Sequence, residues 1–144
     1  MSQLKPVRAG LDVGFGDAGF PECFAGLKGP AWRSIPITDE FPFVDEQFDA
    51  VVLHGSIVTP KTVREAHRVL KPAGRLYFIV PEKTKGQNGF TMPDIYATVR
   101  GGYDISEVAR PKWWWFGMKG RTFTICATKK HWRSMEKATY RPYL

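Results

Sequence analysis

The stretch that decides the fold runs from residue 48 to residue 80 and reads FDAVVLHGSIVTPKTVREAHRVLKPAGRLYFIV. It opens with an apolar, β-branched run at 48–53, which suits a strand buried on both faces. Thr59 can cap a following helix, and Pro60 fits its first turn, where a missing N–H costs nothing. A second apolar run follows at 75–80. The order strand, helix, strand predicts a right-handed βαβ unit.

This stretch and the residues before it resemble the class I S-adenosylmethionine (SAM) methyltransferases. FPFVDEQFDAVV at 41–52, followed by REAHRVLKPAGRLYF at 64–78, is similar to the fourth strand, fourth helix and fifth strand of that family. Ala73 replaces the first glycine of the family's turn. We expect Pro72 to stop the helix and Gly74 to supply the turn.

The resemblance implies an α/β fold, an abbreviated Rossmann-like methyltransferase fold with a mostly parallel sheet. Strands near Leu11, Val51 and Phe78 are expected to run parallel. The sheet should end in an antiparallel C-terminal ribbon near Val108 and Ile125, because both segments match the last two strands of the family. Another doubly wound α/β domain is the alternative.

A glycine-rich loop follows the first predicted strand. The segment 12–19 has the pattern D-x-G-x-G-x-x-G, in which glycines allow positive φ and a close approach of a ligand. The resemblance implies that this loop wraps the methionine end of SAM and that its acidic residue lies near the ligand amino group. The expected cofactor residues are Asp12, Gly14, Gly16 and Gly19. A glycine-rich turn that only closes a strand is the alternative.

The chain departs from the family between Gly19 and Phe48, where fewer than thirty residues remain. The family has a helix of about four turns there, and a strand that ends in an acidic residue binding the ribose hydroxyls. Repeated prolines and glycines leave room for one short helical turn at 22–27. A strand at 32–37 is confined by Pro36 to an edge, to its start or to a bulge. We therefore expect one helix and one strand to be missing, together with the ribose acid.

Two further polar residues are candidates for the site. Asp39 stands where the resemblance implies an acidic residue beside the adenine, although the acidic run around it also fits a solvated loop. His54 follows the carboxyl end of the strand at 48–53, where catalytic groups of open α/β sheets lie, and it could act as a general base. A hydrogen-bonded turn residue is the alternative for His54.

Aromatic residues near the C-terminus predict an interface. Trp113, Trp114, Trp115 and Phe116 are consecutive, and adjacent side chains of a strand cannot all face one side. A protein interface is the first interpretation, a covered core edge the second and RNA stacking the third. We divide the chain into a methyltransferase-like domain at 1–129 and a basic, aromatic extension at 130–144 that includes Trp132.

The composition of the chain limits the number of domains, the kinds of partner and the cellular setting that we expect. The chain has 144 residues, enough for one domain. Its net charge of +7 favours an acidic partner such as RNA, an anionic protein surface or a membrane face. No apolar run is long enough for a transmembrane segment, and the N-terminus lacks the apolar region of a secretory signal. The two cysteines lack metal-like spacing, so we expect no metal site and an intracellular setting, cytoplasmic or in an organellar matrix.

Three interpretations of the function remain. The first is a non-catalytic methyltransferase-like subunit that binds or assembles with partners and has a degenerate SAM site, with weak or absent SAM binding. The second is an active but minimal SAM-dependent methyltransferase. A plain nucleotide-binding Rossmann domain is a weaker third reading. The first is favoured because SAM is held mainly by the part of the fold that is shortened here.

Overall fold

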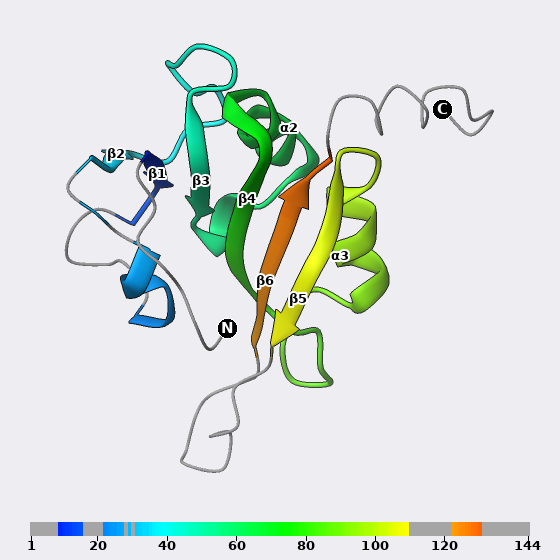
Figure 1. The fold of residues 1–144 in the computed structure, drawn as a ribbon. Helices are drawn as coiled ribbons and strands as arrows, with labels where there is room; N and C mark the ends of the chain where they lie inside the picture. The colour runs from blue at the N-terminus through cyan, green and yellow to red at the C-terminus, as the bar shows by residue number, and fades with distance from the viewer. Residues whose placement is uncertain (1–8, 16–21, 28, 30, 110–121, 131–144) are drawn as a thin grey trace.

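One six-stranded sheet organises the chain (Figure 1). The computed structural model describes residues 9–15, 22–27, 29, 31–109 and 122–130. The strand order is β2-β1-β3-β4-β6-β5. Strands β1 to β4 pair in parallel, whereas β6 is antiparallel to both β4 and β5. The bounds are β1 Gly10–Val13, β2 Arg33–Ile35, β3 Phe48–Leu53, β4 Leu70–Pro81, β5 Tyr103–Ala109 and β6 Thr122–Lys129.

The predicted fold class is therefore confirmed. Leu11 pairs with Val51, and Leu53 pairs with Phe78, each in parallel register. Val108 and Ile125 pair in the antiparallel ribbon. The two apolar runs at 48–53 and 75–80 are adjacent because a βαβ connection returns the chain to the neighbouring position in the sheet.

Helices cover the two faces unequally. The described helices are η1 Glu22–Leu27 and η2 Gly55–Ile57, both 3-10, and the α-helices α2 Pro60–Val69 and α3 Met92–Val99. Helices α2 and α3 pack against alternate β3 and β4 residues such as Val51 and Phe78, which form the larger core. Residues of the opposite face, including Val52 and Tyr77, pack with Phe24 and Leu27 of η1.

As the sequence predicts, the region between β1 and β3 holds few helices and strands. Its described residues hold one helix, η1, and one strand, β2. Strand β2 lies at the edge of the sheet and ends just before Pro36, so the proline removes no ladder hydrogen bond. The space beside β1 is tight, since a Cβ on Gly10 would lie 2.1 Å from the Trp32 ring. The Trp32 ring therefore packs directly on the Gly10 backbone, where any side chain would clash.

Helix α2 begins as predicted and ends differently. The Thr59 hydroxyl accepts a hydrogen bond from the Thr62 N–H at 3.2 Å, which caps the helix. The helix ends at Val69, before Pro72, because the chain enters β4 at Leu70.

The turn after α2 also differs from expectation. Positive φ falls on Ala73, at 65°, and not on Gly74. Gly74 is needed for a different reason: a Cβ there would lie 2.8 Å from the Lys71 carbonyl oxygen. Gly74 therefore lies at the predicted place for a reason of packing, and the left-handed backbone conformation falls on Ala73.

Candidate functional site

The carboxyl ends of β1, β2 and β3 meet at one edge of the sheet, where open α/β sheets bind ligands. Gly14 follows β1 with φ of +95°, a conformation that favours glycine. A Cβ on Gly14 would lie 2.9 Å from both the Ile37 Cγ1 and the His54 Cβ. Gly14, Ile37 and His54 therefore form one contact cluster at this edge. Gly16 and Gly19 lie outside the described residues.

Asp12 organises the start of the glycine loop. Its side chain is fully buried. One carboxylate oxygen accepts a hydrogen bond from the Phe15 N–H at 3.2 Å, and the other accepts one from the Ser34 hydroxyl at 2.6 Å. The residue thus ties the loop to β2. Because each oxygen already accepts a bond from the protein, a ligand amino group would have to share them.

His54 is built into the turn that follows β3. Its Nδ1 accepts a hydrogen bond from the Ser56 N–H at 3.1 Å and lies 2.7 Å from the Ser56 hydroxyl. A nitrogen that accepts from a backbone N–H carries no proton, so the neutral ring is protonated on Nε2. In this tautomer Nε2 donates and has no lone pair for a substrate proton. The ring also packs on Phe15, with 5.0 Å between centroids.

The end of β2 carries no carboxylate. Ser34 of this strand donates to Asp12, and Pro36 and Ile37 follow the strand. Ile37 is 56% exposed. The position where the resemblance implies a ribose-binding acid is therefore occupied by a hydroxyl and aliphatic groups.

Asp39 lies further along the same connection and is engaged elsewhere. Its carboxylate forms an ion pair with the Lys61 ammonium at 3.2 Å, in the first turn of α2, and both side chains are more than half exposed. The pairing places Asp39 beside α2 and partly neutralises its charge.

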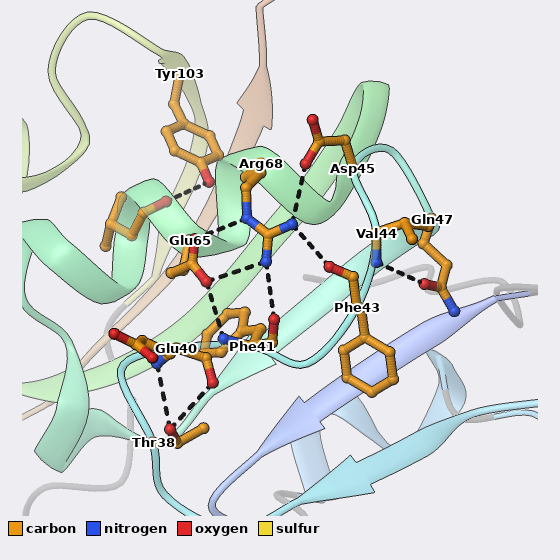
Figure 2. A network of polar contacts seen from close by, with 11 residues as sticks. Thr38, Glu40, Phe41, Phe43, Val44, Asp45, Gln47, Glu65, Arg68 and Tyr103 are labelled. Carbon is orange, nitrogen blue, oxygen red and sulfur yellow. Dashed lines mark hydrogen bonds and ion pairs between the residues drawn. The ribbon is translucent and has the colours of Figure 1, made fainter.

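The residues before β3 are fixed to α2 by Arg68, as Figure 2 shows. We call residues 38–47 the strap. The Arg68 guanidinium donates to the Phe41 and Phe43 carbonyl oxygens at 2.8 and 2.7 Å and to the Asp45 carboxylate at 3.0 Å. Its remaining donors bind both oxygens of Glu65, at 2.8 and 3.1 Å. All five N–H donors of the guanidinium are therefore used.

Glu65 also binds the strap directly and so completes this hydrogen-bond network. Its carboxylate also accepts a hydrogen bond from the Phe41 N–H at 2.9 Å. Hydrogen bonding to Arg68 lowers the pKa of Glu65, and the same bond raises the pKa of Arg68 further above its usual range. Sequence reasoning missed the network, although its signal was the joint presence of FPF at 41–43 and REAHR at 64–68.

The predicted interface residues Trp113, Trp114, Trp115, Phe116 and Trp132 lie outside the described residues. The segment 110–121 joins Ala109 of β5 to Thr122 of β6. Thr122 pairs with Pro81 at the carboxyl end of β4. Thr122 therefore lies at the same edge of the sheet as Gly14 and His54.

Among the described residues, no group of three His, Cys, Asp or Glu side chains is placed to hold a metal ion. No helix of the described part of the chain is both long and apolar enough to cross a membrane.

The sheet order, the glycine loop after β1 and the βαβ unit define the class I methyltransferase fold. Residues 24–78 match the family model described as a methyltransferase domain. The resemblance to SAM-dependent methyltransferases is therefore confirmed. No curated protein sequence matches the chain.

Solved structures share the fold at low sequence identity. A methyltransferase candidate from Bacillus halodurans is 15% identical, with a TM-score of 0.64 over 88% of this chain and 94% of its own. The 1,6-didemethyltoxoflavin-N1-methyltransferase of Burkholderia thailandensis, solved with S-adenosylhomocysteine, is 17% identical, with a TM-score of 0.62 over 88% and 72%. A methyltransferase candidate from Haloferax volcanii, in complex with the activator Trm112, is 14% identical, with a TM-score of 0.60 over 89% and 85%.

Proposed function

We propose that this chain is a methyltransferase-like binding or assembly subunit whose SAM site is degenerate. The observation that carries the proposal is the carboxyl end of β2, where Ser34 bonds to Asp12 and Ile37 packs against Gly14. A ribose diol needs acceptors at this position, and an aliphatic side chain offers none.

The energetic consequence is weak binding of SAM. Each charge-assisted hydrogen bond that is lost weakens binding by roughly 1.5–3 kcal/mol. That loss corresponds to about a ten- to a hundredfold lower affinity. The Asp39–Lys61 ion pair adds a further cost, because the carboxylate must leave or share its partner before it can bind an adenine amino group.

His54 supports a non-catalytic role for the same edge. Its Nδ1 is occupied by Ser56, and its Nε2 carries the proton in the neutral ring. Proton abstraction by His54 would require the Ser56 bond to break. No other histidine of the described residues lies at the carboxyl ends of the strands, since His67 is on α2.

The partners proposed from the sequence remain a protein first and RNA second. The three tryptophans and Phe116 at 113–116, the extension with Trp132 and the net charge of +7 favour an acidic macromolecular surface. Thr122, which follows the tryptophans in the sequence, lies at the same edge of the sheet as the candidate site, and this supports the role. The Haloferax neighbour, which was solved with an activator protein, illustrates such an assembly on the same fold.

An active minimal methyltransferase is the second candidate, and one observation favours it. The buried Asp12 accepts the Phe15 N–H and so keeps the start of the glycine loop ordered. The Burkholderia neighbour has S-adenosylhomocysteine bound in the same fold. SAM or its product therefore remains a reasonable ligand to test.

The proposal is tested by restoring the missing acid. Ile37→Asp places a carboxylate beside Gly14, and Ile37→Asn is the uncharged control of the same size. We expect calorimetric titration with SAM to show at least tenfold tighter binding by Ile37→Asp than by the unaltered chain, with a smaller gain for Ile37→Asn. Equal, micromolar binding by all three proteins would refute the proposal, because the acid would then be dispensable.

A further inference from the structure

A groove lies between helix α3 and strand β5, at the opposite edge of the sheet from β2 (Figure 1). Its volume is about 620 Å³, within the range of small-molecule pockets and so large enough for an aromatic side chain. Tyr96, which lines this groove, is 55% exposed, so the described residues cover only part of the apolar surface. The apolar lining consists of Pro93, Tyr96, Ala97, Val99, Tyr103 and Ile105.

Lys130, the last residue that the structure describes, also lines the groove. Its N–H donates to the Gly102 carbonyl oxygen at 2.9 Å, and its ammonium forms an ion pair with Asp104 at 3.8 Å. The preceding Lys129 is also held in place, because its buried ammonium donates to the Leu70 carbonyl oxygen at 2.7 Å. The first residue of the C-terminal extension at 130–144 is therefore a fixed part of the groove wall.

The extension carries an aromatic residue close to this fixed point. It continues after Lys130 as HWRSMEKATYRPYL, so Trp132 stands two positions further along the chain. Two residues span at most about 7 Å, and the tether from Lys130 to Trp132 is correspondingly short. A short tether raises the effective concentration of the attached group to about the millimolar range. Trp132 thus has an advantage at this groove over any side chain that arrives from another molecule.

The chemistry of an indole ring fits the groove. Its apolar body matches the apolar lining, whereas its N–H needs an acceptor when the ring is buried. Asp104 lines the groove and offers such an acceptor. Its Oδ1 pairs with Lys130, and its Oδ2 accepts no hydrogen bond within the described part of the chain.

A smaller hollow on the other side of the Gly101–Gly102 turn lacks this connection to the extension. Its volume is about 380 Å³, and α2 residues such as Val63 and His67 contribute to its lining. Lys130 does not line it. The place of Lys130 therefore favours the groove between α3 and β5 as the one that the extension reaches.

We propose that the C-terminal extension folds back on its own domain and that Trp132 occupies the groove between α3 and β5. The extension then covers Tyr96 and lies beside β5, which pairs only with β6 among the described strands. An edge strand covered in this way is protected from pairing with another chain. The contact does not depend on the SAM site, and it assigns Trp132 to the free chain before any partner binds.

Nuclear magnetic resonance of the full chain tests the proposal. We expect nuclear Overhauser contacts between the Trp132 indole and the Tyr96 ring or the Ile105 methyl groups, unchanged on dilution. Trp132→Ala should shift the amides at 93–105, because the ring current of the indole is lost. Trp113→Ala, the same chemical change outside the extension, is the matched control and should leave these amides unshifted.

A variant of the groove gives the reciprocal test. Tyr96→Ala removes an exposed ring, so the variant should fold, and its amide dispersion verifies this. The Trp132 indole N–H resonance should then move toward that of an unstructured tryptophan. An unmoved resonance, the absence of contacts between Trp132 and the groove, or equal shifts in Trp113→Ala would each overturn the proposal. Contacts that disappear on dilution would assign the groove to a second copy of the chain and would overturn it as well.

Discussion

Arg68 and Glu65 lie one helical turn apart on α2 and bind each other through both oxygens of the carboxylate, with Nε–Oε2 and Nη2–Oε1 distances of 2.8 and 3.1 Å. The pair does more than stabilise its own helix. Glu65 accepts the Phe41 N–H, and Arg68 donates to the Phe41 and Phe43 carbonyl oxygens (Figure 2). The polar backbone of the strap, next to the buried Phe41 ring, is thereby satisfied by two side chains of a neighbouring helix.

The first prediction concerns this pair. Arg68→Lys keeps the charge but cannot reproduce the five-donor fork, so we expect the free energy of unfolding to fall by about 1–3 kcal/mol. Arg64→Lys, on the same helix but without a hydrogen bond or ion pair among the described residues, should change it by less than about 0.5 kcal/mol. Urea unfolding measures the free energy of unfolding of both variants. Equal midpoints for the two variants would show that the strap does not depend on Arg68.

The second prediction concerns the turn after α2. Ala73 has φ of 65°, where a Cβ is strained by about 1–2 kcal/mol, whereas glycine gains freedom in the unfolded chain. Ala73→Gly should therefore raise the free energy of unfolding by about 0.5–1 kcal/mol. Gly74→Ala should lower it, because the new Cβ would lie 2.8 Å from the Lys71 carbonyl oxygen. Thermal unfolding distinguishes them, and the opposite order would contradict this account of the turn.

The third prediction concerns pH. The pKa of His67 is about 4 in the folded chain, against the ordinary value of 6.5. As pH falls below 6.5 the unfolded chain binds the proton first, so stability is lost until the pH reaches the folded pKa. Partial exposure reduces the effect, and we expect a loss of about 1–2 kcal/mol between pH 7 and pH 5.

His67→Gln provides the comparison for this pH dependence. The variant has no titrating group at this position, so its free energy of unfolding should change less between pH 7 and pH 5 than that of the unaltered chain. Other titrating residues contribute equally to both proteins and cancel. The same slope in both would mean that burial and the Lys129 charge do not hold His67 neutral.

Much of the fold was predictable because its signals are local. Thr59 and Pro60 mark the start of α2, and the proline at 36 confines β2 to an edge, as observed. Strand β2 and helix η1 were also placed within the short connection after Gly19. Each of these depends on a residue's own backbone preferences, which the sequence states directly.

The site was less predictable because its contacts are not local. The Asp12–Ser34 bond joins residues 22 positions apart, and the Asp39–Lys61 pair joins two different elements. The sequence of an acidic run does not indicate whether its carboxylates face solvent, a cofactor or Arg68. Only the packing of α2 on the strap distinguishes Asp45, which binds Arg68, from Asp39, which binds Lys61.

The most direct test of the central claim is calorimetric titration of the unaltered chain with SAM and S-adenosylhomocysteine, repeated with Gly16→Val, which puts a branched side chain into the glycine loop. The account predicts weak or undetectable heat from both ligands, in the millimolar range or weaker, and no difference between the two proteins. Micromolar or tighter SAM binding that Gly16→Val abolishes would contradict it and would restore the active methyltransferase.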